Sequence, residues 1–196
     1  MRFFVQVFVT LLVIVDPLGT VPPFLTLAGH RGAVQRRRLA WQAVVVAGGV
    51  IAVFALFGQQ ILAYLGITLP ALRGAGGLLL LLVALELLTG RGGAEAVRDV
   101  NVALVPLGTP LIAGPGAIVA TIVFVREAHG PGDALAIALA LGAVLVLLYL
   151  ALRFSIALLR VVRPGGIHLL TRLFGLLLAA IAVQLVAESV RGFVHG

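Results

Sequence analysis

The stretch from Phe3 to Gly29, FFVQVFVTLLVIVDPLGTVPPFLTLAG, decides the fold, because it is long enough to cross a membrane and yet is broken near its middle. A membrane helix needs about 20 mainly apolar residues. The only formal charge in the stretch is Asp16, and Pro17, Pro22 and Pro23 follow it. Proline inside a helix removes a backbone hydrogen bond and clashes with the preceding turn, at a cost of about 3 kcal/mol or more. The stretch therefore predicts a discontinuous membrane span.

The composition of the whole chain also indicates a membrane protein. The 196 residues are 62% hydrophobic and 11% charged, and the mean hydropathy is +1.21. Soluble domains are about 45–50% apolar and about 25% charged. Too few polar residues remain for a tethered soluble enzyme or receptor domain. The net charge of +7 has no hydrated surface on which to bind nucleic acid, so we expect no such partner.

Uncharged runs place six predicted helices in the bilayer, over 3–29, 39–65, 72–90, 101–126, 133–160 and 172–190. The predicted fold is thus an all-α membrane protein with a single transmembrane domain over 1–196. Six spans put both termini on the same side of the membrane, together with the loops after the second and fourth spans. That side carries four arginines, and the other side carries ten. Arginine-rich loops stay in the cytoplasm, so both termini are predicted outside it.

The prolines are concentrated in two of the six spans. Pro70, Pro131 and Pro164 lie at predicted loops or span ends, whereas the other six lie inside the first and fourth spans: Pro17, Pro22, Pro23, Pro106, Pro110 and Pro115. Both of these helices are therefore predicted to be discontinuous.

An internal repeat relates the two halves of the chain. Gly77-Leu-Leu-Leu80 recurs as Gly175-Leu-Leu-Leu178, an offset of 98 that also pairs Pro17 with Pro115. A competing match, Pro17-Leu-Gly-Thr20 against Pro106-Leu-Gly-Thr109, has an offset of 89. Repeats over about 1–92 and 99–190 would hold three spans each, so the second would be inverted relative to the first. Inverted repeats with broken helices are typical of transporters.

Three motifs resemble the MarC family of bacterial inner-membrane proteins: Asp16-Pro-Leu-Gly-Thr-Val-Pro-Pro-Phe24, Pro106-Leu-Gly-Thr-Pro-Leu-Ile-Ala-Gly-Pro-Gly-Ala-Ile118, and Arg172-Leu-Phe-Gly-Leu-Leu-Leu-Ala-Ala-Ile-Ala-Val-Gln184. The resemblance covers essentially the whole chain. It implies a multi-pass protein of the bacterial inner membrane, in a family that looks related to LysE-type exporters of amino acids and other small solutes.

Asp16 is the leading candidate for a binding residue, because a carboxylate near the middle of the bilayer is costly without a partner, a cavity or a proton. It is interpreted either as a cation or proton site or as a helix cap, since Asp before Pro is a favourable N-cap. Gly114-Pro115-Gly116 forms the second predicted break. A half-helix that starts there, or after Asp16-Pro17, would offer free N–H groups to an anion. Facing breaks would suit a small zwitterion or a carboxylate-bearing solute; hinges without a ligand are the alternative.

The remaining candidates are polar residues near these breaks. Thr20 and Thr109 follow them and can bond freed carbonyls or a ligand, and Gly19 belongs to the first motif. Glu86 is either a structural polar residue near the interface or part of an inner vestibule.

The sequence thus predicts a secondary transporter or exporter of a small solute; a membrane-embedded sensor or assembly partner is the alternative. No enzyme motif is present, and the absence of cysteine excludes a thiolate metal site. We expect no cofactor beyond proton or cation coupling. The expected partners are the lipid bilayer and the solute, and a homo-oligomer stays open.

The predicted orientation can be tested with fusions after His195. A reporter that is active only in the cytoplasm should give no signal there, whereas a reporter active only outside should give one, because the arginine asymmetry places this end outside. A bright cytoplasmic fusion would reverse the orientation.

Overall fold

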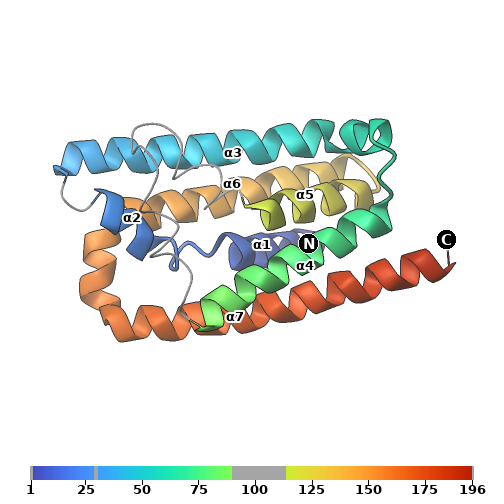
Figure 1. Ribbon diagram of the computed structural model, residues 1–196. Coiled ribbons are helices and arrows are strands. Elements are labelled where there is room, and N and C mark those ends of the chain that lie inside the picture. The colour runs from blue at the N-terminus through green and yellow to red at the C-terminus, as the bar shows by residue number, and fades with distance from the viewer. Residues whose placement is uncertain (1, 29–30, 90–113, 196) are drawn as a thin grey trace.

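The computed structural model describes residues 2–28, 31–89 and 114–195, and every element in these ranges is a helix (Figure 1). The helices are α1 (Arg2–Val15), α2 (Val21–Ala28), α3 (Ala33–Tyr64), α4 (Leu69–Thr89), α5 (Pro115–Glu127), α6 (Pro131–Arg153) and α7 (Ser155–His195).

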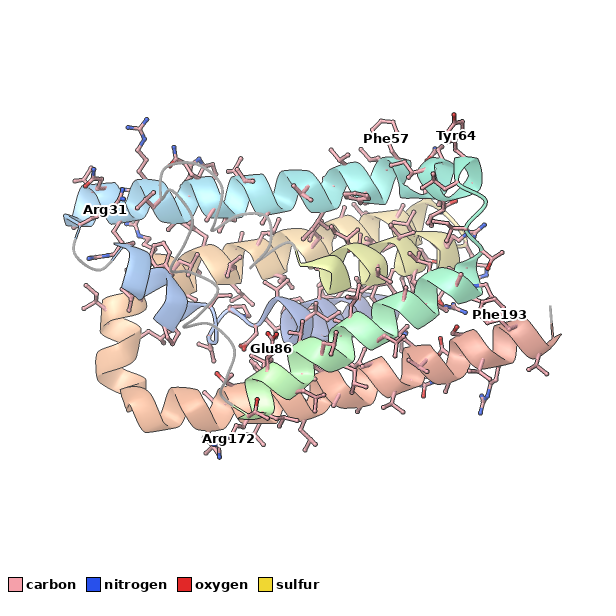
Figure 2. The ribbon with its side chains drawn as sticks, in the orientation of Figure 1. Arg31, Phe57, Tyr64, Glu86, Arg172 and Phe193 are labelled. Carbon is pink, nitrogen blue, oxygen red and sulfur yellow. The ribbon has the colours of Figure 1, made fainter. Side chains whose placement is uncertain are left out.

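Four helices are long and apolar enough to cross a membrane: α3, α4, α6, and the part of α7 over Leu169–Val194. The helix α1 is apolar but shorter. Large apolar side chains cover the outside of the bundle; Figure 2 shows Phe57 and Tyr64 projecting outward from α3, where they are 55% and 92% exposed. Such a surface requires an apolar solvent, so this is an integral membrane protein.

The larger core lies among α1, α3, α5 and α6. Val7, Leu11 and Val15 recur every fourth residue on one face of α1 and are buried. Residues spaced in this way lie above one another on a helix, so α1 presents one continuous apolar face to the long helix α6. Ala40 and Ala47 on α3 are also fully buried in this core.

The helix α4 packs chiefly against α7, and the contacts repeat with the offset of 98 found in the sequence. A Cβ on Gly77 would lie 2.8 Å from the carbonyl oxygen of Ala182, and one on Gly175 would lie 3.3 Å from that of Ala84. Gly175 lies 98 residues after Gly77, and Ala182 lies 98 residues after Ala84. The second contact therefore joins the same two sequence positions as the first, with the roles of the two helices exchanged. A Cβ on Gly77 would also contact Val186, and one on Gly175 would contact Leu88. Leu88 and Val186 are again 98 residues apart.

This reciprocity extends to the small core between α4 and α7. Its buried members are Leu80, Ala84, Leu178 and Ala182, which form two pairs separated by 98, together with Val13 of α1. Pro70 at the start of α4 contacts Gly192 near the end of α7, so the two helices run antiparallel. Glycine at 77 and 175 permits the close approach of the two backbones, as small residues do in membrane helix pairs.

The first predicted span consists of two helices. α1 ends at Val15 and α2 begins at Val21, so Asp16–Thr20 lie between them. The fourth predicted span is described only from Gly114 onward, and α5 begins at Pro115; Thr109, Pro106 and Pro110 lie outside the described residues.

The predicted loop between the fifth and sixth spans is wrong. Helical backbone continues from Ser155 to His195, so Pro164 lies inside α7 and not at a span end. Figure 1 shows that α7 is sharply bent near its beginning. Proline and neighbouring glycine are common where helices bend, because a bend tolerates the missing hydrogen bond.

Alanine at the α4–α7 contact should destabilise the protein. Gly77→Ala and Gly175→Ala should each lower the stability by about 1–3 kcal/mol, the usual range for overpacking, because each Cβ meets backbone or a branched side chain. The measurement is the midpoint of thermal unfolding in detergent.

Gly49→Ala and Gly142→Ala are the matched controls, since a Cβ there meets nothing within 4 Å. Alanine should raise stability at both positions, by about 1 kcal/mol at most, through its higher helix propensity. Equal effects at all four glycines would refute the packing argument.

Candidate functional site

The turn between α1 and α2 is held by its own side chains. Asp16 is in the left-handed region, with φ of 40°. Its Oδ1 accepts a hydrogen bond of 3.0 Å from the Gly19 N–H, and Thr20 Oγ1 donates one of 3.0 Å to the Pro17 carbonyl. Both side chains are buried. The turn thereby satisfies backbone groups that would otherwise lack partners in a membrane.

Asp16 caps this turn and not a helix that starts at Pro17. The predicted N-cap with Pro17 as the first helical residue is therefore wrong, because α2 begins only at Val21. The φ of 40° at Asp16 also differs from the extended backbone of a helix N-cap. Gly19 is necessary to this arrangement, since a Cβ there would overlap the Asp16 carboxyl group.

The second carboxylate oxygen of Asp16 is not satisfied. Asp16 is only 5% exposed, and Oδ2 is buried without a hydrogen-bond donor among the described residues. A buried acceptor without a partner is costly, and more so when it carries charge. Such a group is suited to receive a proton, a cation or the ammonium group of a solute.

The helix N-termini offer few donors to an anion, contrary to the sequence-based expectation. At α2 the N–H groups of Val21 and Phe24 donate to Leu18 and Thr20, and Pro22 and Pro23 have none. At α5 the N–H groups of Ala117 and Ile118 both donate to the Gly114 carbonyl, and Pro115 has none. Local turn formation and proline therefore leave little free N–H, and the geometry favours a cationic ligand over an anionic one.

The structure brings the two predicted breaks close together. A Cβ on Gly116 would lie 3.5 Å from Ile14 Cγ2, two residues before Asp16, and would overlap Leu80. Gly116 is thus required for the start of α5 to approach α1 and α4. Gly114 has a φ of −57°, which residues other than glycine also adopt. Its backbone conformation therefore does not require glycine.

The other candidates lie apart from this turn or outside the described residues. Glu86 is exposed on α4, and Figure 2 labels it on that helix; its backbone carbonyl accepts a hydrogen bond of 3.5 Å from Thr89 Oγ1. Thr109 lies outside the described residues.

An apolar cavity of about 380 Å³ lies beside the turn, between α1, α6 and α7. Pro17 and Leu18 form one side, and Phe154 and Phe174 contribute the aromatic surface. The turn therefore combines one unsatisfied carboxylate oxygen with a neighbouring apolar space.

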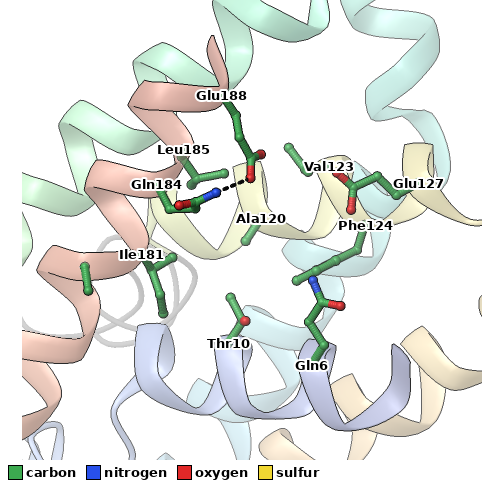
Figure 3. A pocket seen from close by; sticks show the side chains of 11 residues that line it. Gln6, Thr10, Ala120, Val123, Phe124, Glu127, Ile181, Gln184, Leu185 and Glu188 are labelled. Carbon is green, nitrogen blue, oxygen red and sulfur yellow. Dashed lines mark hydrogen bonds between the residues drawn. The ribbon is translucent and has the colours of Figure 1, made fainter. Parts of the chain in front are cut away.

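A cluster of charged residues that the sequence analysis missed joins α4, α5 and α7. Arg73 forms an ion pair with Glu127, and its Nε lies 3.8 Å from Glu188 Oε2. Glu188 Oε1 accepts a hydrogen bond of 2.8 Å from Gln184 Nε2 (Figure 3). None of Arg73, Glu127 and Glu188 is among the candidates that the sequence analysis names. The predicted topology could have indicated this cluster, because it places Arg73 and the end of the fourth span, near Glu127, on the same side of the membrane.

With this geometry established, comparison with known proteins identifies the family. A family model described as MarC family integral membrane protein matches residues 1–194. The chain belongs to the MarC family. This confirms the resemblance carried by the three sequence motifs.

Relatives of this MarC-family chain occur in archaea and bacteria. It is 38% identical to a UPF0056 membrane protein of Methanocaldococcus jannaschii, with 98% of each chain covered. It is 31% identical to the UPF0056 membrane protein YvbG of Bacillus subtilis, covering 97% of this chain and 95% of the relative. It is 29% identical to the corresponding Escherichia coli protein YhcE, covering 96% and 92%. No solved structure matches.

The close approach of Gly19 to Asp16 can be tested with a double-mutant cycle. Gly19→Ala alone should lower the thermal stability by about 1–3 kcal/mol, because its methyl group displaces the carboxylate. In an Asp16→Ala background the same change should cost much less, because the overlapping atoms all belong to Asp16. Additive effects of the two substitutions would contradict this contact.

Proposed function

We propose that this MarC-family protein is a secondary transporter or exporter of a small, amino-acid-like or other organic solute, and not an enzyme. The observation that carries the proposal is the buried carboxylate of Asp16, held in a non-helical turn with one oxygen unpartnered among the described residues. Ionisable groups within membrane spans are rare and mark ion, proton or substrate pathways.

The architecture proposed with this function is a pair of inverted three-span repeats, about 1–92 and 99–190, with discontinuous first and fourth helices. The reciprocal contacts of Gly77 and Gly175 support the repeat, because a two-fold relation between the halves requires each contact to occur twice. The turn at Asp16–Thr20 and the start of α5 at Pro115 support the two breaks.

The proposed site lies where these breaks meet, near Asp16, Pro17, Gly19, Thr20, Gly114, Pro115 and Gly116. Asp16 would bind a proton, a metal cation or the ammonium group of the solute. The adjacent apolar cavity suits the hydrocarbon part of such a solute, since small-molecule sites are mostly apolar with few polar groups that fix orientation.

The proposed location is the cytoplasmic membrane, with both termini outside the cytoplasm. This orientation rests on the arginine asymmetry of the sequence. It places the α5–α6 connection and the start of α4, with Arg73, on the external side.

Two substitutions at Asp16 separate a binding role from a capping role. Asp16→Asn should abolish transport while the protein keeps its fold, because asparagine tolerates left-handed backbone and can still accept from the Gly19 N–H, but carries no charge. Asp16→Ala should also lower stability, by about 0.5–1.5 kcal/mol, because the hydrogen bond from the Gly19 N–H is lost. The measurement is counterflow of labelled amino acids and small organic acids in liposomes, with thermal unfolding of each variant.

Asp133→Asn serves as a control, since it neutralises a carboxylate at the start of α6, outside the proposed site, and keeps an oxygen for the His129 N–H, so transport should be unchanged. If Asp16→Asn transports like the unmodified protein while Asp16→Ala only unfolds more readily, Asp16 is a cap. That outcome would favour the non-transporting sensor or assembly partner.

A further inference from the structure

A second cavity, of about 320 Å³, lies between α1, α5 and α7 and has a different character from the apolar one. Five polar side chains line it, from three helices (Figure 3): Gln6, Thr10, Glu127, Gln184 and Glu188. Polar side chains are costly in a membrane-spanning bundle unless they pair or line water. Their convergence on one void indicates a hydrated site.

The cavity lies at the end of the bundle that holds the N-terminal part of α1. Phe3 of α1 packs edge-on against Phe124 of α5, with the ring centroids 6.1 Å apart. Gln6 and Thr10 follow on α1, four residues apart and so on one face of the helix. Thr10 lies six residues before Asp16, or about 9 Å of helix rise.

Apolar residues follow Thr10 along α1 toward Asp16. Beyond Thr10, Val13 is buried and packs with Leu80 and Leu178 in the small core between α4 and α7. The cavity and Asp16 are thus separate sites along one helix.

Among the described residues, the two carboxylates that line this cavity and the Arg73 beside them sum to a single negative charge. Glu127 and Glu188 are each 34% exposed at the side chain, and Arg73, 19% exposed, is the cation beside them. Arg73 is committed to Glu127 through its ion pair, and its contact with Glu188 is 3.8 Å long. Glu188 Oε2 therefore keeps acceptor capacity toward the cavity.

The remaining groups complete an oxygen-rich site. The amide group of Gln184 donates to Glu188 Oε1, which leaves its own carbonyl oxygen available. Thr10 and Gln6 add a hydroxyl and a second amide oxygen from the opposite wall. Carboxylate, amide and hydroxyl oxygens around one net negative charge suit a monovalent cation or the ammonium group of a solute.

We propose that this cavity is an outer binding site for a monovalent cation or primary ammonium group, with Glu188 as its charged ligand. The proposal deepens the proposed function and rests on it, because the site would lie on the transport route between the external face and Asp16. Glu188 binds and neutralises the cation, Gln184 orients the Glu188 carboxylate, and Arg73 neutralises Glu127 through its ion pair.

The test measures thermal unfolding of the purified full chain in detergent against sodium, potassium and methylammonium chlorides. N-methylglucamine chloride at equal ionic strength serves as the reference, and the Asp16→Asn background removes any contribution from the central carboxylate. A cation that binds only the folded protein raises the midpoint with concentration. We expect this rise for at least one of the three salts.

Glu188→Gln should raise the half-saturating concentration by about tenfold or more, the usual effect of losing a charged hydrogen-bond acceptor. It retains an oxygen for the Gln184 amide, so the fold is preserved. Asp133→Asn is the matched control, since Asp133 does not line the cavity and Asn keeps an oxygen for the His129 N–H, and it should leave the half-saturating concentration unchanged. Arg73→Gln should lower it, because the positive charge beside the two carboxylates is removed and the net negative charge at the cavity increases.

The three salts distinguish the sources of the ligand chemistry. Stabilisation by sodium or potassium indicates a coupling ion, and stabilisation by methylammonium alone indicates the solute's own ammonium group. The proposal is overturned if no salt exceeds the reference, or if Glu188→Gln responds like the unmodified protein. Either result leaves the counterflow test of Asp16 unaffected, so the two proposals fail separately.

Discussion

The rest of this structure depends on the requirement that backbone polar groups inside a membrane find partners within the protein. A continuous helix meets that requirement by itself, but a chain with prolines at 17, 22 and 23 does not. Here the interruption is satisfied by two short side chains: Asp16 accepts from the Gly19 N–H, and Thr20 donates to the Pro17 carbonyl. Because Asp16 uses only one oxygen in this way, the solution to a backbone problem leaves a carboxylate oxygen available for function.

The rigid part of the bundle supports this local irregularity. The helices α4 and α7 approach closely through Gly77 and Gly175, and Leu80 of the same pair packs at Gly116, where α5 begins. The contacts of Gly77 and Gly175 are with backbone and apolar side chains. The polar and charged groups of the same pair lie elsewhere, where α1 and α5 meet it: Arg73 on α4, and Gln184 and Glu188 on α7.

The sequence predicted what depends on composition and local chemistry. The apolar runs of α3, α4 and α6 are visible from hydropathy. The sequence predicts a loop where α7 bends, since proline and glycine occur both in loops and at helix bends. Only the packing of the helix decides between a loop and a bend. The ion pair of Arg73 with Glu127 depends on which helices meet, which residues 54 positions apart do not reveal. The free N–H groups expected at α2 and α5 are mostly consumed by turns, because the preceding carbonyls lie within reach.

The two proposed repeats differ most at the position where the charge lies. At the offset of 98, Asp16 corresponds to Gly114, Gly19 to Ala117 and Thr20 to Ile118. In the second half, the Gly114 carbonyl accepts from both Ala117 and Ile118, and the chain enters α5 directly. In the first half, the Asp16 carbonyl accepts only from Thr20, while the Gly19 N–H turns to the carboxylate. The helix α2 starts four residues later than the proposed repeat would place it because Pro22 and Pro23, which correspond to Ala120 and Thr121, cannot donate to the carbonyls of Leu18 and Gly19. The irregularity of the first half therefore originates in its prolines, and Asp16 satisfies the Gly19 N–H within the turn that results.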